Sequence, residues 1–296
     1  MSSLVSIYIP TFNRLEMLQR AIHSVCSQTY DHLEVLVVDD CSSDGTRAYL
    51  EHLPEQDARI RVFLKDANSG ACASRNIALR NCRGVFATGL DDDDYVLPNH
   101  VQELIDCYQS KERAGLLDVV VFPQMATTGE DGEVRKMQQP LGRVDFGALK
   151  IKNYIGNQVF ARTDRYIDAG LFDERLPAWQ DYDLWLRMAA RGAIMHKSPT
   201  PTYIYEDDQS SQKISNAKYE RILGAYNIVS SQNSLNLSKR EKLILKMNYF
   251  RYAQAPMSIG DLAAYVASGI VLSPSKTYVK KVLGKAFGMS QTKGWS

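Results

Sequence analysis

The stretch LEVLVVDD, residues 33–40, is an apolar run that ends in two acids. Such a run suits a strand that is buried on both faces, as strands are in a parallel sheet. Strand patterns also occur at residues 5–10, 60–64, 85–90 and 118–123, and helical patterns separate them. Strands that alternate with helices predict βαβ units. We therefore expect an α/β fold with a mostly parallel, mixed sheet flanked by helices.

The remaining elements follow from hydrophobic periodicity and from capping residues. Helices are expected at residues 15–27, from Ser43 or Asp44 through Leu50, at 71–82, from Pro98 to about Tyr108, at 163–169 and at 180–191. Strands are expected at residues 154–162, 193–197 and 201–206, and a hairpin or loop at 126–153. From about Ile214 the pattern is helical. We expect one α/β domain over residues 1–210 and a helical C-terminal extension over 211–296.

Composition limits the class of protein. The chain has 296 residues, of which 45% are apolar and 23% charged, as is typical of a soluble globular protein. It has no apolar run of about 18 residues that could span a membrane. The N-terminus has no basic segment before its first apolar run, so it does not resemble a signal peptide. The five cysteines match no metal-ligand spacing. We expect reduced thiols and a cytoplasmic location.

The charges are unevenly distributed along the chain, although the net charge is only +1. From Ser238 onward there are ten basic and two acidic residues, so the rest of the chain is acidic. Residues 278–289, YVKKVLGKAFGM, have apolar residues at helical spacing with lysines beside them. Such a helix can lie on the anionic inner face of the cytoplasmic membrane, or it can pack on the body with its lysines in water. Both interpretations stay open. We expect no nucleic-acid partner.

Polar clusters follow three of the predicted strands. They are PTFNR after the first strand, DDCSSDGT after the second and DDDD after the fourth. Ligands of open parallel sheets bind at the carboxyl ends of the strands. We therefore expect the three clusters to face one site.

The DDDD run places the carboxylates of Asp91, Asp92, Asp93 and Asp94 side by side. Two such charges about 4 Å apart repel by roughly 4 kcal/mol near a protein surface. A solvated, turn-rich loop is one explanation. A divalent cation is another, because Mg²⁺ and Mn²⁺ take carboxylate and phosphate oxygens as ligands. Along an extended segment Asp91 and Asp93 point one way and the other two point the opposite way. We expect only one of these pairs to face a cation.

A phospho-accepting receiver domain also has an acidic strand end after a VVDD strand. Such a domain, however, begins with the VVDD strand, and here a complete strand–helix unit precedes it. The chain also continues far beyond the size of a receiver domain. We therefore do not favour this interpretation.

Five segments occur in a characteristic order: VSIYIPTFNR, EVLVVDDCSSDGT, NSGACASRNIAL, GLDDDDYVLP and WQDYDLWLRMAARG. Together they resemble the family-2 glycosyltransferases with the GT-A fold, over roughly residues 4–206. The resemblance implies inverting, metal-dependent transfer of a hexose from a nucleotide-diphosphate sugar, with UDP-hexose expected. The implied acceptor is a hydroxyl of a bacterial surface glycan, and a lipid-linked acceptor would suit the basic tail.

The resemblance also implies roles for residues at the first two strand ends. Pro10, Thr11 and Phe12 would line the nucleotide base. Phe12 would stack on a pyrimidine, or else fill the core. Asp40 would accept a hydrogen bond from the base. Arg75 would face the nucleotide, unless it is only a charge on the surface of a helix.

The family's DxD element corresponds to Asp91-Asp92-Asp93. The resemblance places Asp91 near the ribose and the metal, and makes Asp93 the direct ligand of Mn²⁺ or Mg²⁺. Asp92 belongs to the expected substrate-binding residues, but its role and that of Asp94 stay open.

The WQDYDLWLRM segment, residues 179–188, would supply the general base. The resemblance assigns this role to Asp181, which takes the proton of the acceptor hydroxyl. A helix N-cap is the alternative role for Asp181. Asp183 is the second choice for the base. Gln180 stands where the family usually has Glu. Trp179 would be a sugar platform, and Trp185 would be part of the core.

One departure from the family concerns residues 203–215, YIYEDDQSSQKIS. Many relatives have a basic residue and a His there, whereas this chain has Glu206, Asp207 and Asp208. Either Asp208 supplies an oxygen to the metal, or the metal and Lys213 alone neutralise the diphosphate.

Two other functions are compatible with parts of this pattern. A sugar nucleotidyltransferase also needs acids and a metal, but it should have a glycine-rich basic loop after its first strand, and PTFNR is not one. A nucleotide-sugar-binding assembly protein would bind the same ligands without turnover.

Overall fold

The structure is a computed structural model that describes residues 3–129, 131–206, 219–253 and 260. The chain divides into two units. The first contains Met1–Leu149 and Asn153–Ser211, and the second contains Lys150–Lys152 and Gln212–Ser296. All the predicted site residues that the structure describes belong to the first unit.

The first unit is built around a five-stranded sheet with the order β3-β2-β1-β4-β9. Its strands are β1 (Val5–Thr11), β2 (Leu33–Asp39), β3 (Ile60–Leu64), β4 (Phe86–Gly89) and β9 (Ala161–Arg162). The first four are parallel to their neighbours, and β9 is antiparallel to β4. Every residue of β2 is buried, as the apolar run at 33–40 predicted, and so is every residue of β1.

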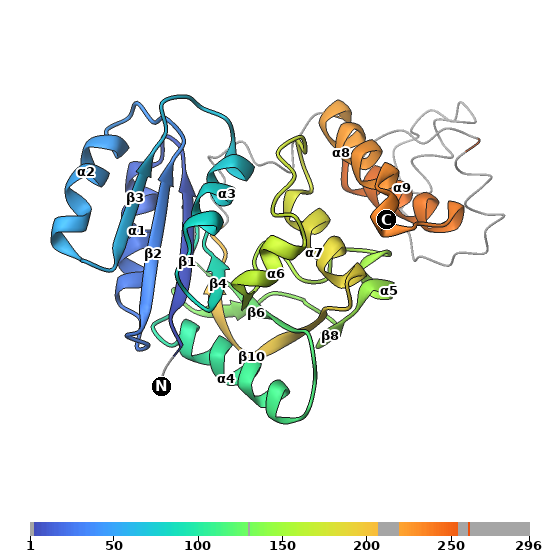
Figure 1. The fold of residues 1–296 in the computed structure, drawn as a ribbon, viewed down its shortest axis with the longest axis horizontal. Coiled ribbons are helices and arrows are strands. Elements are labelled where there is room, and N and C mark those ends of the chain that lie inside the picture. The colour runs from blue at the N-terminus through green and yellow to red at the C-terminus, as the bar shows by residue number, and fades with distance from the viewer. Residues whose placement is uncertain (1–2, 130, 207–218, 254–259, 261–296) are drawn as a thin grey trace, which may run out of the picture. The chain divides into compact units, whose positions relative to one another are not determined.

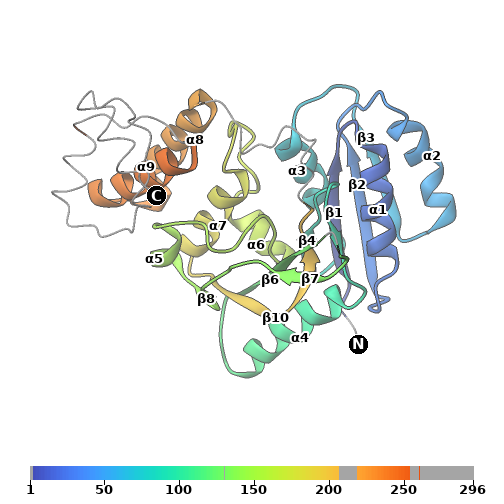
Figure 2. The same cartoon turned by 180° about the vertical axis from the view of Figure 1, so that it is seen from behind.

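Helices cover both faces of this sheet. Figures 1 and 2 show α1 (Leu15–Cys26) and α2 (Thr46–Gln56) on one face and α3 (Ala71–Asn81) on the other. Alternate residues of a strand point to opposite faces, so each strand contributes to two packing layers. The layer beneath α1 contains Val5, Ile7, Ile9, Val35 and Val37 from the strands and Leu18, Ile22 and Val25 from the helix.

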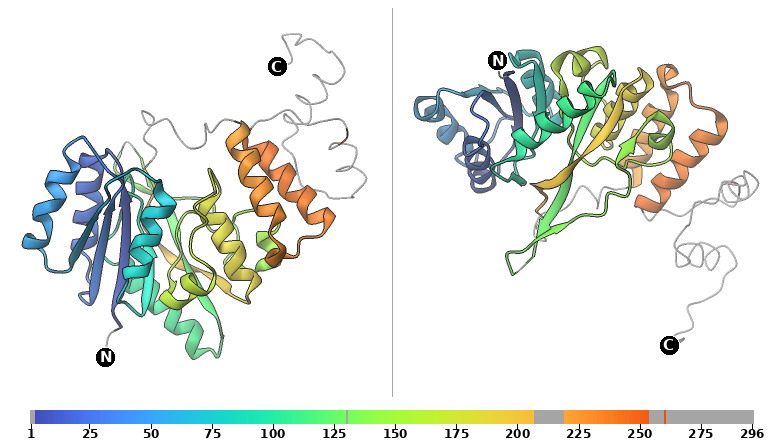
Figure 3. Two further views of the ribbon diagram at one scale, coloured as in Figure 1. Left: turned by 45° about the horizontal axis from the view of Figure 1, so that its top comes forward. Right: turned by 90° about the horizontal axis from the view of Figure 1, so that it is seen from below.

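A second sheet in the same unit has the order β5-β10-β6-β7, and β8 also pairs with β10. Its strands are β5 (Tyr95–Val96), β6 (Val119–Thr128), β7 (Val134–Lys136), β8 (Arg143–Val144) and β10 (Ile194–Ile204). Helix α4 (His100–Arg113) connects β5 to β6. The β6–β7 hairpin projects from the rest of this sheet (Figure 3, right). The predicted fold class is confirmed, and its strands are divided between two sheets.

The DDDD run lies between β4 of the first sheet and β5 of the second. The chain therefore passes from one sheet to the other at the four aspartates. Elements of both sheets can contact the four side chains, and this arrangement positions the candidate site.

The strand predicted at residues 154–162 is wrong for most of its length. Only β9 pairs in a sheet, and Phe160 makes an isolated bridge with Val121. The Asn153 side chain instead closes a turn, because its Oδ1 accepts hydrogen bonds from the N–H groups of Ile155 (3.0 Å) and Gly156 (3.2 Å). Gly156 has a φ of +110°, far from the negative φ of a regular strand.

Other elements differ from the prediction mainly in their bounds. Helix α2 begins at Thr46, after Gly45 with a φ of +97°, and extends beyond Leu50 to Gln56. The two strands predicted at 193–197 and 201–206 form one strand, β10, with register shifts between Lys197 and Tyr203. The remaining helices of the unit are α5 (Phe146–Leu149), α6 (Thr163–Asp168) and α7 (Gln180–Ala190).

The second unit contains α8 (Tyr219–Ser231), the 3₁₀ turn η2 (Asn233–Leu235) and α9 (Lys239–Ala253). Ser238 and Glu241 form a capping box at the start of α9, because each side chain accepts a hydrogen bond from the other's backbone N–H (3.2 and 2.8 Å). No helix among the described residues is long and apolar enough to cross a membrane. The basic segment at 278–289 lies outside the described residues.

A substitution of Gly89, at the end of β4, tests how closely the side chains next to the aspartates are packed. A Cβ there would lie 2.2 Å from Gln158 Oε1 and 2.4 Å from Tyr8 Cε2. Gly89→Ala should therefore lower the free energy of unfolding by about 1–3 kcal/mol, because the packed ring must move. The matched control is Gly142→Ala, whose Cβ meets nothing within 4 Å. Thermal melts should separate the two variants, and equal melting temperatures would contradict the packing described.

Candidate functional site

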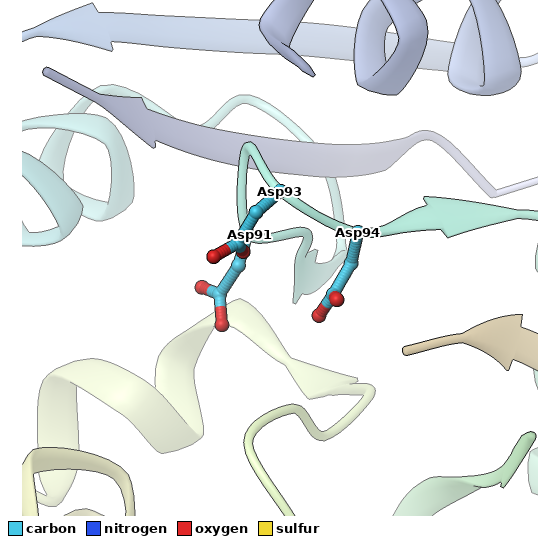
Figure 4. A group of neighbouring side chains, drawn as sticks. All are labelled: Asp91, Asp93 and Asp94. Carbon is cyan, nitrogen blue, oxygen red and sulfur yellow. The ribbon is translucent and has the colours of Figure 1, made fainter. Parts of the chain in front are cut away.

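The four aspartates form a turn rather than an extended segment. The backbone N–H of Asp94 donates to the carbonyl of Asp91 at 3.1 Å, which reverses the chain. The predicted alternation is therefore wrong, because a turn does not place successive side chains on opposite faces. Ligand atoms of Asp91, Asp93 and Asp94 lie within 4.8 Å of one another. Figure 4 shows the three carboxylates gathered on one side of the turn.

Asp92 is turned toward the end of β1. Its carboxylate accepts hydrogen bonds from Thr11 Oγ1 at 2.7 Å and from Arg14 NH1 at 2.9 Å. Burial raises the pKa of Asp92 to about 6, although Arg14 and Thr11 act in the opposite direction. These contacts tie the turn to the first polar cluster.

Amide and hydroxyl donors hold the carboxylates of Asp91 and Asp94. Asn157 Nδ2 donates to Asp91 Oδ2 (2.9 Å) and to Asp94 Oδ2 (3.2 Å), and Gln158 Nε2 donates to Asp91 Oδ1 (3.1 Å). The Tyr203 hydroxyl donates to Asp94 Oδ2 at 2.6 Å. Burial, and then the charges of Asp91 and Asp93, raise the pKa of Asp94 well above its usual value. The donors offset part of the repulsion among these acids.

Asp93 is the member of the cluster with the most room for a further ligand. Its side chain is 32% exposed, against 22% for Asp91. Among the described residues, its neighbours donate to only one of its carboxylate oxygens, Oδ2, which accepts from Arg14 NH1 at 2.8 Å. Burial and the nearby charge of Asp91 raise the pKa of Asp93.

This donor set fits a divalent cation. All the converging ligand atoms are carboxylate oxygens, which are the ligands of Mg²⁺ and Mn²⁺. Asp93 and Asp91 therefore stay the predicted metal ligands, and the structure adds Asp94 as a third candidate.

The predicted nucleotide-binding residues lie at the ends of β1 and β2. Pro10 and Thr11 end β1, and Phe12 is 43% exposed, so the core-filling alternative for Phe12 is wrong. Asp40 is buried and accepts hydrogen bonds from the backbone N–H groups of Ser69 (2.9 Å) and Gly70 (2.8 Å). It also pairs with the ammonium of Lys65. In this structure Asp40 holds the loop that precedes α3, and a contact with the base stays a prediction.

Arg75 connects the aspartate turn to the start of α7. It is buried, so the interpretation as a surface charge is wrong. Its NH2 donates to Asp91 Oδ1 at 2.9 Å and its NH1 to Gln180 Oε1 at 3.1 Å. NH1 also lies 3.8 Å from Asp181 Oδ1. The guanidinium stacks over the ring of Phe172, 5.3 Å from its centroid.

Asp181 lies in the first turn of α7 and is not its N-cap. The N-cap is Trp179, with a φ of +61° and no side-chain cap bond. Asp181 Oδ1 is buried and has no hydrogen-bond partner among the described residues, although the side chain is 26% exposed. The pKa of Asp181 is raised to about 7: burial is the largest cause, the guanidinium of Arg75 acts in the opposite direction, and the charge of Asp91 contributes to the rise. A carboxylate with a pKa near neutrality is suited to accept a proton.

The other predicted residues in and next to α7 contact protein groups. Asp183 is fully buried and accepts hydrogen bonds from Arg187 Nε (2.9 Å) and NH2 (2.7 Å). The hydroxyl of a sugar acceptor therefore cannot reach it. Trp185 is fully buried and its Nε1 donates to Gly156 O at 3.2 Å, so it belongs to the core as predicted. Trp179 is half-buried, with its ring edge-on to Tyr182. Its role as a sugar platform stays a prediction.

Several residues that surround the turn are not among the residues predicted from the sequence. They are Arg14, Arg20, Asn157, Gln158 and Tyr203. The sequence contains a signal for three of these residues. Arg14 belongs to the PTFNR cluster, and the amides Asn157 and Gln158 interrupt an apolar run. Tyr203 has no such signal.

Glu206 takes part in the site through its backbone. Its N–H donates to Asp94 Oδ1 at 3.1 Å, and its carboxylate pairs with Arg20. The structure thus accounts for one of the three acids that replace the expected basic residue and His. Asp207, Asp208 and Lys213 lie outside the described residues, so the two alternatives for the diphosphate stay open.

The sequence matches glycosyl transferase family 2 over residues 6–170. WcaA of Escherichia coli (strain K12), a glycosyl transferase assigned to colanic acid biosynthesis, is 34% identical over 221 residues. That alignment covers 72% of this chain and 76% of WcaA.

Two solved structures have a similar fold. S. aureus TarS 1–349 in complex with UDP-GlcNAc has a TM-score of 0.62 at 18% identity, covering 96% of this chain and 83% of that chain. The mannosyltransferase PcManGT of Pyrobaculum calidifontis, in complex with GDP-Man and Mn²⁺, has a TM-score of 0.57 at 16% identity, covering 96% and 84%. Other relatives are longer. The chain spans 37% and 36% of two Rickettsia glycosyltransferases and half of a longer TarS chain.

The different surroundings of Asp183 and Asp181 predict different effects on stability. Asp183→Asn should lower the free energy of unfolding by about 3–5 kcal/mol, because it leaves Arg187 buried without its carboxylate. Asp181→Asn is the matched control. It should leave stability at pH 8 unchanged or higher, because burial disfavours the ionised form of Asp181. Denaturant titrations of both variants measure the difference, and equal losses would contradict these assignments.

Proposed function

Because the chain belongs to glycosyl transferase family 2, we propose that it transfers a hexose from a nucleotide-diphosphate sugar to a glycan hydroxyl with inversion at the anomeric carbon. The observation that carries the proposal is the position of Asp181. Its buried Oδ1 accepts no hydrogen bond from the described residues and lies 3.8 Å from NH1 of Arg75, which in turn binds Asp91 of the aspartate turn. One connected group of side chains thus contains both a proton acceptor and a candidate cation site.

We propose a uridine diphosphate sugar as the donor. The exposed ring of Phe12, next to Pro10 and Thr11 at the end of β1, can stack on a pyrimidine. TarS, which shares the fold, has been crystallised with UDP-GlcNAc. Asp40, Arg75, Asp92 and Trp179 remain the proposed donor-binding residues.

We propose a bacterial surface polysaccharide as the acceptor. The relationship to WcaA, a protein assigned to colanic acid biosynthesis, supports this choice. A lipid-linked acceptor, and attachment to the cytoplasmic face of a membrane through the basic tail, belong to the same proposal.

Mn²⁺ or Mg²⁺ would be held by Asp93 and Asp91, with Asp94 beside them. When bound, the ion supplies positive charge that stabilises the leaving diphosphate. PcManGT, which shares the fold, has been crystallised with Mn²⁺.

The transfer needs one displacement. The acceptor oxygen attacks the anomeric carbon while the bond from that carbon to the diphosphate oxygen breaks, and the bonding electron pair leaves with the diphosphate. Asp181 takes the proton of the attacking hydroxyl. Attack and departure occur on opposite faces of the sugar, so the configuration inverts without a covalent enzyme intermediate.

Asp181→Asn should lower the turnover number by about 100-fold or more, because the proton acceptor is lost while the site keeps its shape. Release of UDP is the measurement, with UDP-glucose, UDP-galactose and UDP-N-acetylglucosamine as donors and undecaprenyl-diphosphate-linked sugars as acceptors. UDP affinity should stay within about twofold of the wild type. A normal transfer rate would rule out Asp181 as the base. UDP binding by the wild type without turnover of any donor would instead favour a binding protein.

The pH profile provides a second readout of the same residue. Burial raises the pKa of Asp181 to about 7, so the ionised base forms only as the pH rises through neutrality. The wild-type rate should therefore increase between pH 5.5 and pH 8. A rate that is already maximal at pH 5.5 would contradict this assignment.

Asp93→Ala should weaken the binding of UDP in the presence of Mn²⁺ by about tenfold or more, because a ligand of the cation is lost. Isothermal titration with UDP, with Mn²⁺ and after treatment with EDTA, measures the effect. Asp168→Ala removes an exposed acid of α6 and serves as the control for loss of charge. Unchanged Mn²⁺-dependent affinity in the Asp93 variant would remove Asp93 from the metal site.

A further inference from the structure

Arg14 bridges two of the four aspartates. It follows β1, and its NH1 donates to Asp92 Oδ1 at 2.9 Å and to Asp93 Oδ2 at 2.8 Å. Asp92 is also held by Thr11, so this end of the bridge is anchored to the strand. The Arg14 guanidinium thus occupies one oxygen of the acid that has the most room for a cation.

Within the part of the chain that the structure describes, the other cationic side chains near the turn, Arg75, Arg20 and Lys65, each pair with protein groups. Arg75 is buried and bonded to Asp91 and Gln180. Arg20 donates to the carbonyl of Asp93, pairs with Glu206, and stacks over the ring of Tyr95. Lys65 pairs with Asp40.

Arg14 differs from these residues in its exposure. Its side chain is 39% exposed, and the hydrogen bonds described for it use only NH1. A guanidinium has five N–H donors in a planar fork, so Nε and NH2 can donate elsewhere while NH1 stays on Asp92. The fork matches two oxygens of a phosphate group.

The balance of charge at the site also supports a role for Arg14 in binding the diphosphate. When ionised, the four aspartates carry four negative charges, and the guanidinium groups that bond to their carboxylates, Arg14 and Arg75, carry two positive ones. One divalent cation would neutralise the remaining two charges. A diphosphate that then enters adds further negative charge, and of these two guanidinium groups only Arg14 is exposed enough to bind it.

We propose that Arg14 is a diphosphate-binding residue that Asp93 holds in place until a divalent cation takes that carboxylate. Arg14 then keeps its bond to Asp92 and donates to the oxygens of the leaving diphosphate. The inference rests on the proposed function, because it requires a nucleotide-diphosphate donor and a cation at Asp93. In this role Arg14 would take the place of the basic residue that the family resemblance leads us to expect near residues 203–215.

Two opposite effects of one substitution distinguish this role from a merely structural one. Without Arg14, Asp93 is free and the turn is more negative, so a divalent cation alone should bind more tightly. UDP in the presence of that cation should bind more weakly, because the diphosphate loses a charged donor. A residue that only supports the turn would weaken both.

The experiment measures the binding of Mn²⁺ alone by electron paramagnetic resonance, and the binding of UDP at saturating Mn²⁺ by calorimetry. Arg14→Met should bind Mn²⁺ roughly threefold or more tightly. The same variant should bind UDP·Mn²⁺ about tenfold more weakly. Arg162→Gln, which removes an exposed guanidinium paired with Asp164, is the matched control and should change neither value. Uridine, which has no phosphate, should bind equally to the wild type and to both variants.

Weaker binding of Mn²⁺ alone by Arg14→Met would overturn the inference, as would unchanged affinity for UDP·Mn²⁺. If Arg14→Met does not fold, the same binding measurements are made on Arg14→Lys. It keeps the charge but lacks the planar fork, so it should weaken UDP·Mn²⁺ binding severalfold, and wild-type affinity would overturn the inference. The proposed function fails separately, and this inference with it, if Mn²⁺ has no effect on UDP binding by the wild type.

Discussion

Four adjacent carboxylates repel one another, and the side chains that surround Asp91–Asp94 offset that repulsion. Each close pair costs roughly 4 kcal/mol near a protein surface if nothing compensates. The compensation comes from elements far apart in the sequence. Arg14 follows β1, Arg75 comes from α3, Asn157 and Gln158 come from an irregular segment, and Tyr203 comes from β10. The turn thereby joins the two sheets of the first unit.

The same contacts connect the turn to the proposed chemistry. Arg75 binds Asp91 and also lies next to Asp181, so the candidate cation site and the candidate base share one buried guanidinium. Burial makes Asp181 a stronger base than an exposed aspartate. Asp183, only two residues away, is fully buried in a salt bridge with Arg187. Position on the helix, and not residue type, separates the two acids.

Much of this could be predicted from the sequence, because it depends on local patterns. The buried run at 33–40 and the alternation of strands and helices indicate a parallel sheet, whose strand ends converge. The convergence of PTFNR, DDCSSDGT and DDDD follows from that topology. Asp39, for example, lies beside Thr11 in the register of β1 and β2.

The parts that could not be predicted depend on backbone turns and on distant partners. The direction of each aspartate is determined by the turn at Asp91–Asp94, and an assumed extended segment placed Asp94 on the wrong side. Asn157 and Gln158 reach the turn only because Asn153 and Gly156 bend the chain before β9. The bridge from Arg14 to Asp92 and Asp93 spans 78 and 79 residues. The sequence predicts that the two clusters share one site, but it does not indicate which of the side chains pair.

The most direct test of the central claim is the position of a bound metal ion. Crystals grown with UDP and Mn²⁺ would be measured at the manganese absorption edge, where anomalous scattering locates the ion independently of the electron density of the protein. The account predicts one anomalous peak within ligand distance of the Asp93 carboxylate, next to Asp91 and in contact with the diphosphate of UDP. Bound UDP with no peak at Asp93, or with the peak at another group of acids, would contradict it.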